Sequence, residues 1–243
     1  MNYLIFVPLC ASLISFIFAF LVFRRYLLRH GPYLLLWAIG MTFYGIGGFC
    51  EAYYGFFGWN PLIFRIWYLF GAILVAAWLG QGTVYLLAKK RTANITMGVL
   101  GIASLYAAFA VFNAKLDPSL MISSLHTGSE LSGHAIITPG VRTLTPFLNL
   151  YGTITLVGGA LYSAWIFWHK RILLHRAIGN VLIAAGAILP AFGGVFSRFG
   201  IPGALYISEL LGSILLFLGF LRATTPIEET KTNLVNQPAN IQP

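Results

Sequence analysis

Long apolar segments recur along this chain and are separated by shorter polar connections. Each segment is close to, or longer than, the roughly 20 residues that an α-helix needs to cross the hydrocarbon core of a bilayer. The pattern predicts an all-α, polytopic membrane protein built as a bundle of seven transmembrane helices. We expect the spans at residues 3–23, 33–57, 62–88, 95–113, 146–168, 177–199 and 204–221.

Lysine and arginine gather in alternate connections, after the first, third, fifth and seventh segments. Cytoplasmic loops carry this excess under the positive-inside rule. We therefore expect a multi-pass protein of the cell membrane with its N-terminus outside and its C-terminus in the cytoplasm. The basic residues concerned are Arg24, Arg25, Arg29, Lys89, Lys90, Arg91, Lys170, Arg171, Arg176 and Arg222.

The composition agrees with this class and removes one kind of partner. Hydrophobic residues make up 58% of the chain and charged residues 9%. A net charge of +9 would indicate nucleic-acid binding in a soluble protein, but these cations stand beside spans, where topology requires them. Lipid headgroups of the bilayer are therefore the expected anionic neighbours, and we expect no nucleic-acid partner.

The spans form one predicted domain, residues 1–222, followed by a tail. Residues 223–243 are polar, contain three prolines and show no apolar period, which predicts a disordered cytoplasmic segment. The connection 114–145, on the expected outer face, is too long for a simple turn. The first and last three spans share an order of glycines, turns and charges that suggests a three-plus-one-plus-three repeat, with Gly47 matched to Gly193 and Gly71 to Gly212.

Charged residues beside two outer hairpins are the strongest candidates for a functional site. Glu51 closes the second span and Arg65 opens the third, while Arg198 and Glu209 occupy similar places in the last hairpin. An ionised side chain at membrane depth is costly enough that it normally faces the bundle interior and finds a partner, so we expect a pair across each hairpin. The pairs are either interfacial salt bridges that fix helix register or an outward-facing site for an ionic ligand.

Three further residues interrupt the apolar segments. Gln81 lies between Gly80 and Gly82. These small neighbours allow a second helix to approach closely and to accept hydrogen bonds from the amide of Gln81. We interpret Gln81 and Asn180 as mid-membrane residues that either bond neighbouring helices or contact a polar ligand. Pro190 lacks an N–H group and is expected to kink or break the sixth span.

Aromatic residues make up 16% of the chain, and most lie near span ends, as in an interfacial belt. An inward-facing cage for a cation or a flat chromophore is the alternative for some of them. The expected belt residues include Trp37, Tyr53, Tyr54, Trp59, Trp67, Tyr68, Trp165 and Trp168. The candidate cage residues are Tyr44, Tyr68, Trp78 and Tyr206.

The residues of common cofactor sites are not found in the expected places. A retinal Schiff base needs a lysine in the last span, and residues 204–221 contain none. The five histidines fall at span ends or in the long connection, where they do not face each other inside the bundle. We therefore expect no cofactor, no metal site, no catalytic residue and no enzymatic activity. Cys10 and Cys50 are typical of packing residues, although a disulfide between them is geometrically conceivable.

Residues 34–87 carry motifs of a known type. They begin Leu-Leu-Leu-Trp-Ala-Ile-Gly and contain Gly-Trp-Asn-Pro-Leu at 58–62 and Arg-Ile-Trp-Tyr-Leu-Phe-Gly at 65–71. This stretch resembles the seven-transmembrane regions of bacterial membrane proteins, including the N-terminal sensory regions of sensor histidine kinases. The resemblance implies a bacterial plasma-membrane location and a sensory role. Because the chain ends soon after Arg222, we expect any signal to leave through a membrane or signalling partner.

Two functions remain open from the sequence. The favoured one is a sensory, receptor or accessory module that binds a small ligand or a membrane partner, which predicts a closed apolar bundle. The alternative is a small solute transporter, which predicts a polar cavity at mid-membrane and matched halves. The predicted topology of the chain resembles that of the seven-span sugar transporters, but their Pro-Gln motif occurs in no span here. The small-residue face at 152–159 fits packing within the bundle or against a second copy in a homo-oligomer.

Overall fold

The computed structural model describes residues 3–117, 119, 131, 133–171, 173–201 and 203–224, without the side chains of Tyr3 and Arg198. Seven helical spans in this part are long and apolar enough to cross a membrane, which confirms the predicted all-helical, multi-span class. The third span is made of three consecutive elements. The elements are α1 (Phe6–Arg29), α2 (Pro32–Phe57), α3 (Pro61–Ile66), the π-helix η2 (Trp67–Leu74), α4 (Val75–Leu87), α5 (Lys90–Asn113), α7 (Leu144–His169), α8 (Leu174–Arg198) and α9 (Ala204–Thr224).

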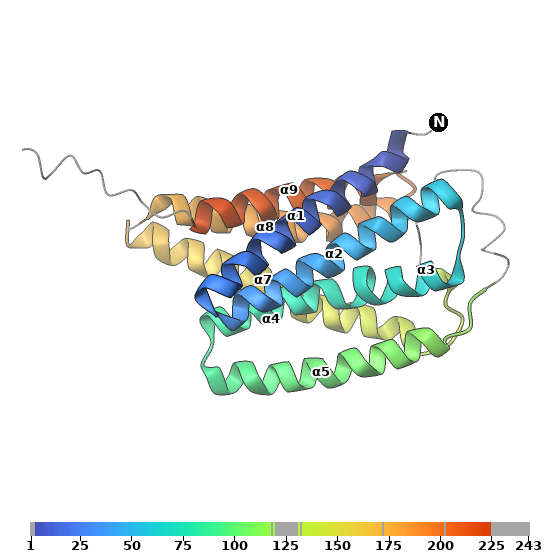
Figure 1. Ribbon diagram of the computed structural model, residues 1–243, viewed down its shortest axis with the longest axis horizontal. Coiled ribbons are helices and arrows are strands. Elements are labelled where there is room, and N and C mark those ends of the chain that lie inside the picture. Colours follow the sequence, from blue (N-terminus) through green and yellow to red (C-terminus); the bar gives the residue numbers. More distant parts are fainter. Residues whose placement is uncertain are drawn as a thin grey trace, which may run out of the picture.

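The connections divide the bundle into two ends (Figure 1). We call the end formed by residues 30–31, 88–89, 170–171 and 173 the basic end, and the end formed by residues 58–60, the described part of 114–143, and residues 199–201 and 203 the loop end. At the basic end α1 continues to Arg29 and α5 begins at Lys90, several residues beyond the predicted limits. Long basic side chains allow this, because their charged heads reach the interface while the backbone stays helical. The predicted tail lies outside the described residues from residue 225 onward.

Six of the seven spans form a closed ring. In chain order α1 packs against α2, α2 against η2 and α4, α4 against α7, α7 against α8, and α8 against α9, which returns to α1. Helix α5 lies outside this ring, along α4 and η2, at the lower edge of Figure 1. The spans before and after α5 are therefore two groups of three with the same order of neighbours.

Close glycine contacts join α8 to α9. A β-carbon at Gly186 would lie 2.7 Å from the carbonyl oxygen of Gly212, and one at Gly179 would lie 2.7 Å from that of Gly219. Lipid tails are as apolar as the side chains, so helices in a bilayer associate through such close packing rather than through the hydrophobic effect. The spacing of seven residues between these glycines places both contacts on one seam.

The glycines of the two groups do not correspond as the sequence suggested. In the first group Gly47 faces Gly71, and a β-carbon at Gly47 would lie 3.0 Å from the α-carbon of Gly71. In the second group Gly193 faces Ser208, and the partner of Gly212 is Gly186. The groups share an order of neighbours, but the predicted matching of Gly193 and Gly212 with the first pair is wrong at the level of contacts.

Apolar side chains fill the centre of the ring. One void at the centre of the ring measures about 10 Å³, close to the minimum that holds one water molecule. No charged residue lines this void. The lining residues, which come from every span of the ring, are Phe18, Trp37, Met41, Leu79, Leu156, Ile183 and Leu216.

Part of the long connection folds back over the loop end. Leu116 and Ile136 form an isolated antiparallel bridge, and the N–H of Ile137 donates to the carbonyl oxygen of Lys115 at 3.0 Å. Two short 3-10 turns, η4 (Gly133–Ala135) and η5 (Val141–Thr143), precede α7. Four buried side chains of this connection belong to the same core cluster as the third span, namely Leu131, Ala135, Ile136 and Val141.

Candidate functional site at the loop end

A capped turn sets the direction of the third span. Oδ1 of Asn60 accepts hydrogen bonds from the N–H groups of Leu62 at 2.9 Å and Ile63 at 3.2 Å, and Pro61 occupies the first helical position. Asparagine is a preferred N-cap, and proline at the first position sacrifices no helical hydrogen bond. This cap fixes the register of the residues that follow, which form the candidate site against α2.

Glu51 is a buried carboxylate on α2. It is 2% exposed, and its Oε1 accepts a hydrogen bond of 2.8 Å from Nε1 of Trp67. Hydrogen bonds to ionised groups are roughly twice as strong as neutral ones. Trp67 is 7% exposed and belongs to the core of the loop end, so its predicted place in the interfacial belt is wrong.

A signal for this contact is present in the sequence. Glu51 stands seven residues before Gly58, and Trp67 stands seven residues after Asn60. Positions equally distant from a turn lie at similar depth on the two helices of an antiparallel hairpin. We expected a charged partner for Glu51, so the indole donor was not predicted.

Trp67 also begins the π-helix η2. Such segments are rare and frequently occur at functional sites. Within η2, Gly71 lies against Gly47 of α2, so the two backbones approach closely one turn beyond Glu51. The buried carboxylate, the indole donor and the π-helix together form the candidate site.

Arg65 has different partners from the one we expected. Its Nε donates to the carbonyl oxygen of Val111 at 3.3 Å, and one of its terminal nitrogens donates to that of Ala114 at 2.8 Å. The last carbonyls of a helix have no intrahelical donors and carry the negative end of the helix dipole, so a guanidinium is a favourable cap. The expected pair of Glu51 with Arg65 is therefore wrong. Arg65 ties α5 to the third span, and Trp67 supplies the hydrogen bond that Glu51 accepts.

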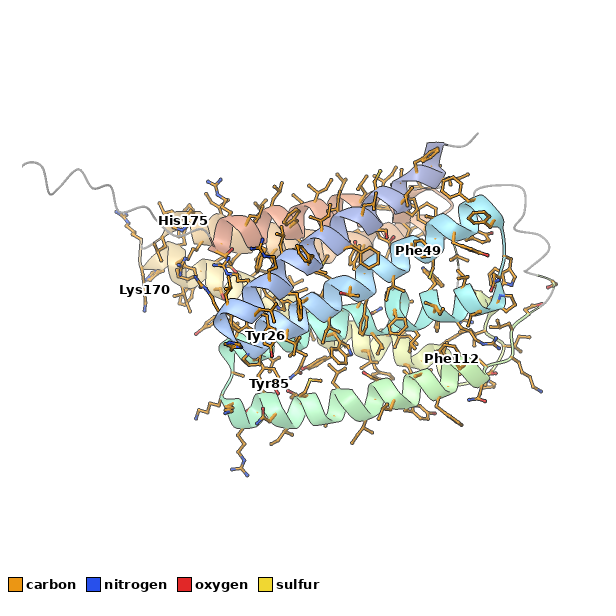
Figure 2. The ribbon with its side chains drawn as sticks, in the orientation of Figure 1. Tyr26, Phe49, Tyr85, Phe112, Lys170 and His175 are labelled. Atoms are coloured by element: carbon orange, nitrogen blue, oxygen red, sulfur yellow. The ribbon has the colours of Figure 1, made fainter. Side chains whose placement is uncertain are left out.

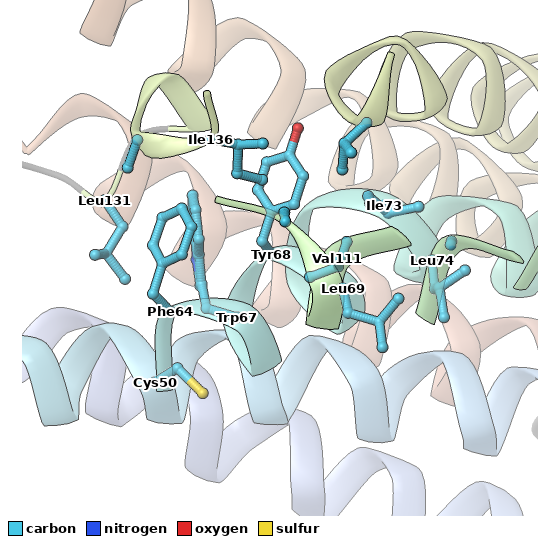
Figure 3. Packing of buried hydrophobic residues seen from close by; sticks show 14 of the residues in the cluster. Cys50, Phe64, Trp67, Tyr68, Leu69, Ile73, Leu74, Val111, Leu131 and Ile136 are labelled. Carbon is cyan, nitrogen blue, oxygen red and sulfur yellow. The ribbon is translucent and has the colours of Figure 1, made fainter. Parts of the chain in front are cut away.

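An aromatic cluster covers the candidate site (Figure 3). Phe64 and Trp67 pack with ring centroids 5.6 Å apart, and Leu131 and Ile136 of the long connection lie in the same cluster. The hydroxyl of Tyr68 is hydrogen-bonded to that of Thr145 at 2.9 Å, which attaches the start of α7 to the third span. Leu131 and Ile136 thus cover the aromatic cluster on the side of the long connection.

The second predicted pair is only partly described. Glu209 is half-buried on α9, and its backbone carbonyl accepts a hydrogen bond of 2.8 Å from the hydroxyl of Tyr44 on α2. The side chain of Arg198 lies outside the described part of the chain. The pairing of Arg198 with Glu209 therefore stays a prediction.

Gln81 joins three spans. Its Nε2 donates to the carbonyl oxygen of Ala93 at 2.9 Å and to the hydroxyl of Thr96 at 3.1 Å, both on α5, and its Oε1 accepts from the hydroxyl of Tyr151 on α7. The side chain is fully buried. These contacts agree with the interhelical interpretation of Gln81, because its donors and its acceptor are all engaged by protein.

The glycines on either side of Gln81 have the predicted effect. A β-carbon at Gly80 would lie 2.8 Å from the α-carbon of Gly152 on α7, and the ring of Trp37 on α2 lies over Gly82. Two neighbouring helices thus approach α4 closely. Trp37 reaches the central void from this position, so it is not confined to the belt in which we placed it.

Asn180 does not contact a mid-membrane ligand site. It lies in the second turn of α8, near the basic end, and its Nδ2 donates to the carbonyl oxygen of Arg176 in its own helix at 2.9 Å. The predicted mid-membrane position is wrong, because α8 begins at Leu174 and Asn180 lies less than two turns from that end of the helix.

Pro190 does not break α8, which runs without interruption from Leu174 to Arg198. The proline removes the N–H that would bond the carbonyl of Gly186. That carbonyl oxygen lies against Gly212, where a β-carbon would be 2.8 Å away. A weak Cα–H contact from a glycine is a known way to accommodate a carbonyl without a strong donor. The expected break is therefore wrong, whereas the kink that we gave as the other outcome stays a prediction.

The proposed aromatic cage is not assembled. The hydroxyls of Tyr44 and Tyr68 bond to α9 and to Thr145, as described above, and Nε1 of Trp78 donates to Ser104 on α5 at 3.2 Å. These three side chains thus bond to three different helices, α9, α7 and α5. Cys10 is exposed and Cys50 is buried, and both are free thiols.

Comparisons with known proteins give no relative, since no family model, no curated protein and no solved structure matches this chain.

Proposed function

We propose that this chain is a sensory or accessory seven-helix module of a bacterial plasma membrane, and that it recognises a small ligand or a membrane partner at the loop end. The proposed orientation puts the loop end outside and the basic end in the cytoplasm. It is supported by the concentration of lysine and arginine at the connections of the basic end.

The apolar centre of the ring is the observation that carries this proposal. A carrier that opens alternately to each side needs a polar site near mid-membrane. Here the two mid-membrane candidates are engaged elsewhere, Gln81 with α5 and α7 and Asn180 with its own helix. The void between the six spans is lined by apolar side chains and has a volume of about 10 Å³. A closed bundle favours a module that reports binding at one end.

The loop end is the favoured place for recognition. Ionisable residues inside a membrane bundle are costly, and they commonly mark functional sites. Glu51 is such a residue, and it is held by Trp67 at the first position of a π-helix.

A small solute transporter remains the second candidate. It is favoured by one observation, the two groups of three spans with the same order of neighbours on either side of α5. Carriers of three-plus-one-plus-three design require this arrangement. Receptors do not, so the arrangement is the reason to test both functions together.

Purification in a mild detergent followed by mass spectrometry of the bound species tests the proposal. A stoichiometric protein partner, or a small molecule lost in Glu51→Gln and retained in the control Lys89→Gln, is the expected result. A polar solute that is retained by Glu51→Gln and lost in Gln81→Leu would overturn it in favour of a transporter.

A further inference from the structure

An apolar groove lies between α7 and α8 at the basic end. Its volume is about 420 Å³, far larger than the central void. Trp165 and Trp168 line it from α7, and Ile178, Val181 and Leu182 line it from α8. Both tryptophans are more than half exposed on the outer surface of the bundle. The groove therefore opens toward the acyl chains of the surrounding bilayer.

Positive charge stands at the end of this groove. Lys170 and Arg171 form the connection between the two helices, and both are exposed. Among the described residues, no carboxylate forms an ion pair with either. Figure 2 shows Lys170 and His175 at the same end of the bundle.

His175 adds a buried polar group beside the charges. On α8 it lies one turn before Ile178, beside the groove but outside the residues that line it. Its Nε2 is buried and has no hydrogen-bond partner among the described residues.

We propose that this groove binds an anionic phospholipid of the inner leaflet, with an acyl chain between α7 and α8 and the phosphate at Lys170 and Arg171. The apolar lining offers no hydrogen bond to a polar solute, whereas it suits a hydrocarbon chain. Tryptophan side chains are preferred at the level of the headgroups. Basic groups at the cytoplasmic ends of helices bind anionic headgroups for the same electrostatic reason.

The charges of Lys170 and Arg171 distinguish an anionic phospholipid from two other occupants of the groove, a zwitterionic lipid and a second copy of the chain. A zwitterionic lipid would fill the groove but would gain little from two unpaired cations. A second copy of the chain would cover Trp165 and Trp168 with protein. Each alternative predicts a different result in the same experiment.

Quenching of tryptophan fluorescence by brominated lipids tests the proposal on the full chain in mild detergent. Brominated phosphatidylglycerol should quench at lower concentration than brominated phosphatidylcholine, by about fivefold for each cation that contributes. The variant Trp165→Phe/Trp168→Phe should lose this component, because the four other tryptophans lie outside the groove.

Charge variants separate the headgroup from the chain. Lys170→Gln/Arg171→Gln should bring phosphatidylglycerol to the level of phosphatidylcholine. The matched control Lys89→Gln/Lys90→Gln removes the same charge from another connection of the basic end and should leave the preference unchanged. Val181→Phe, on an exposed lining position, should weaken quenching by both lipids. Gel filtration confirms that each variant elutes as the parent does.

Two results would overturn the proposal. One is equal quenching by the two lipids together with no effect of Lys170→Gln/Arg171→Gln, which would assign the groove to ordinary bilayer lipid. The other is a dimer in which both tryptophans are protected from quenching until the dimer is dissociated, which would assign the groove to a second copy.

Discussion

The hydroxyl of Tyr151 on α7 donates a hydrogen bond to Oε1 of Gln81 on α4, while the amide nitrogen of Gln81 bonds α5. One side chain thus connects the outlying helix α5 to two spans of the ring. Its neighbours Gly80 and Gly82 permit the required closeness. The connection gives the first prediction on stability.

Gln81→Leu should lower the free energy of unfolding by about 1–3 kcal/mol, since it leaves buried polar groups on two helices without partners. In a double-mutant cycle with Tyr151→Phe, the coupling energy should fall at about 0.6–1.7 kcal/mol, the range of interhelical hydrogen bonds in membranes. Denaturant unfolding in mixed micelles measures both. Asn180→Leu is the matched control, because Asn180 bonds its own helix, and an equal loss there would contradict the interhelical role of Gln81.

The hydrogen bond from Trp67 to Glu51 gives a second prediction. Trp67→Phe removes the donor to a buried carboxylate and should cost about 1.5–3 kcal/mol in stability beyond the loss of packing. Trp59 provides a close comparison, since its Nε1 is buried and has no hydrogen-bond partner among the described residues. Trp59→Phe should therefore cost less. Thermal unfolding followed by circular dichroism ranks the two variants, and the reverse order would show that the bond contributes little.

The glycine seam between α8 and α9 gives a third prediction. Gly186→Ala would place a methyl group 2.7 Å from the carbonyl oxygen of Gly212, so the helices must move apart, at an expected cost of about 1–3 kcal/mol. Gly194→Ala is the control in the same helix, because no atom lies within 4 Å of the added carbon. It should be neutral or should stabilise the helix by roughly up to 1 kcal/mol. Melting temperatures of the two variants test this prediction, and equal values would contradict the close packing of Gly186 on Gly212.

The membrane orientation gives a fourth prediction. With Cys10 and Cys50 replaced by alanine, a cysteine at Thr138 should react with an impermeant maleimide in intact cells. Cysteines at Lys90 or Arg171 should react only after the membrane is opened, because the positive-inside rule places the basic end in the cytoplasm. Labelling of the Lys90 variant in intact cells would invert the topology.

The number and order of the spans followed from hydropathy, because these properties belong to each segment by itself, whereas α1 and α5 extend several residues beyond the predicted limits. A run of about 20 apolar residues must be helical in a bilayer to satisfy its backbone, whatever it packs against. The turn at Asn60 and Pro61 was equally local, since capping depends on adjacent residues. The small residues around Gln81 also predicted close packing correctly.

The partners of the polar side chains were decided only by the tertiary structure. A partner depends on how each helix is rotated about its axis and on which helix lies beside it, and neither property is encoded within one segment. Arg65 therefore caps α5 although a carboxylate lies in the same hairpin, and Trp67 lies inside although its position is typical of the interfacial belt. Pro190 lies within a continuous helix, and Gly212 of α9 packs against the carbonyl that the proline leaves without a donor.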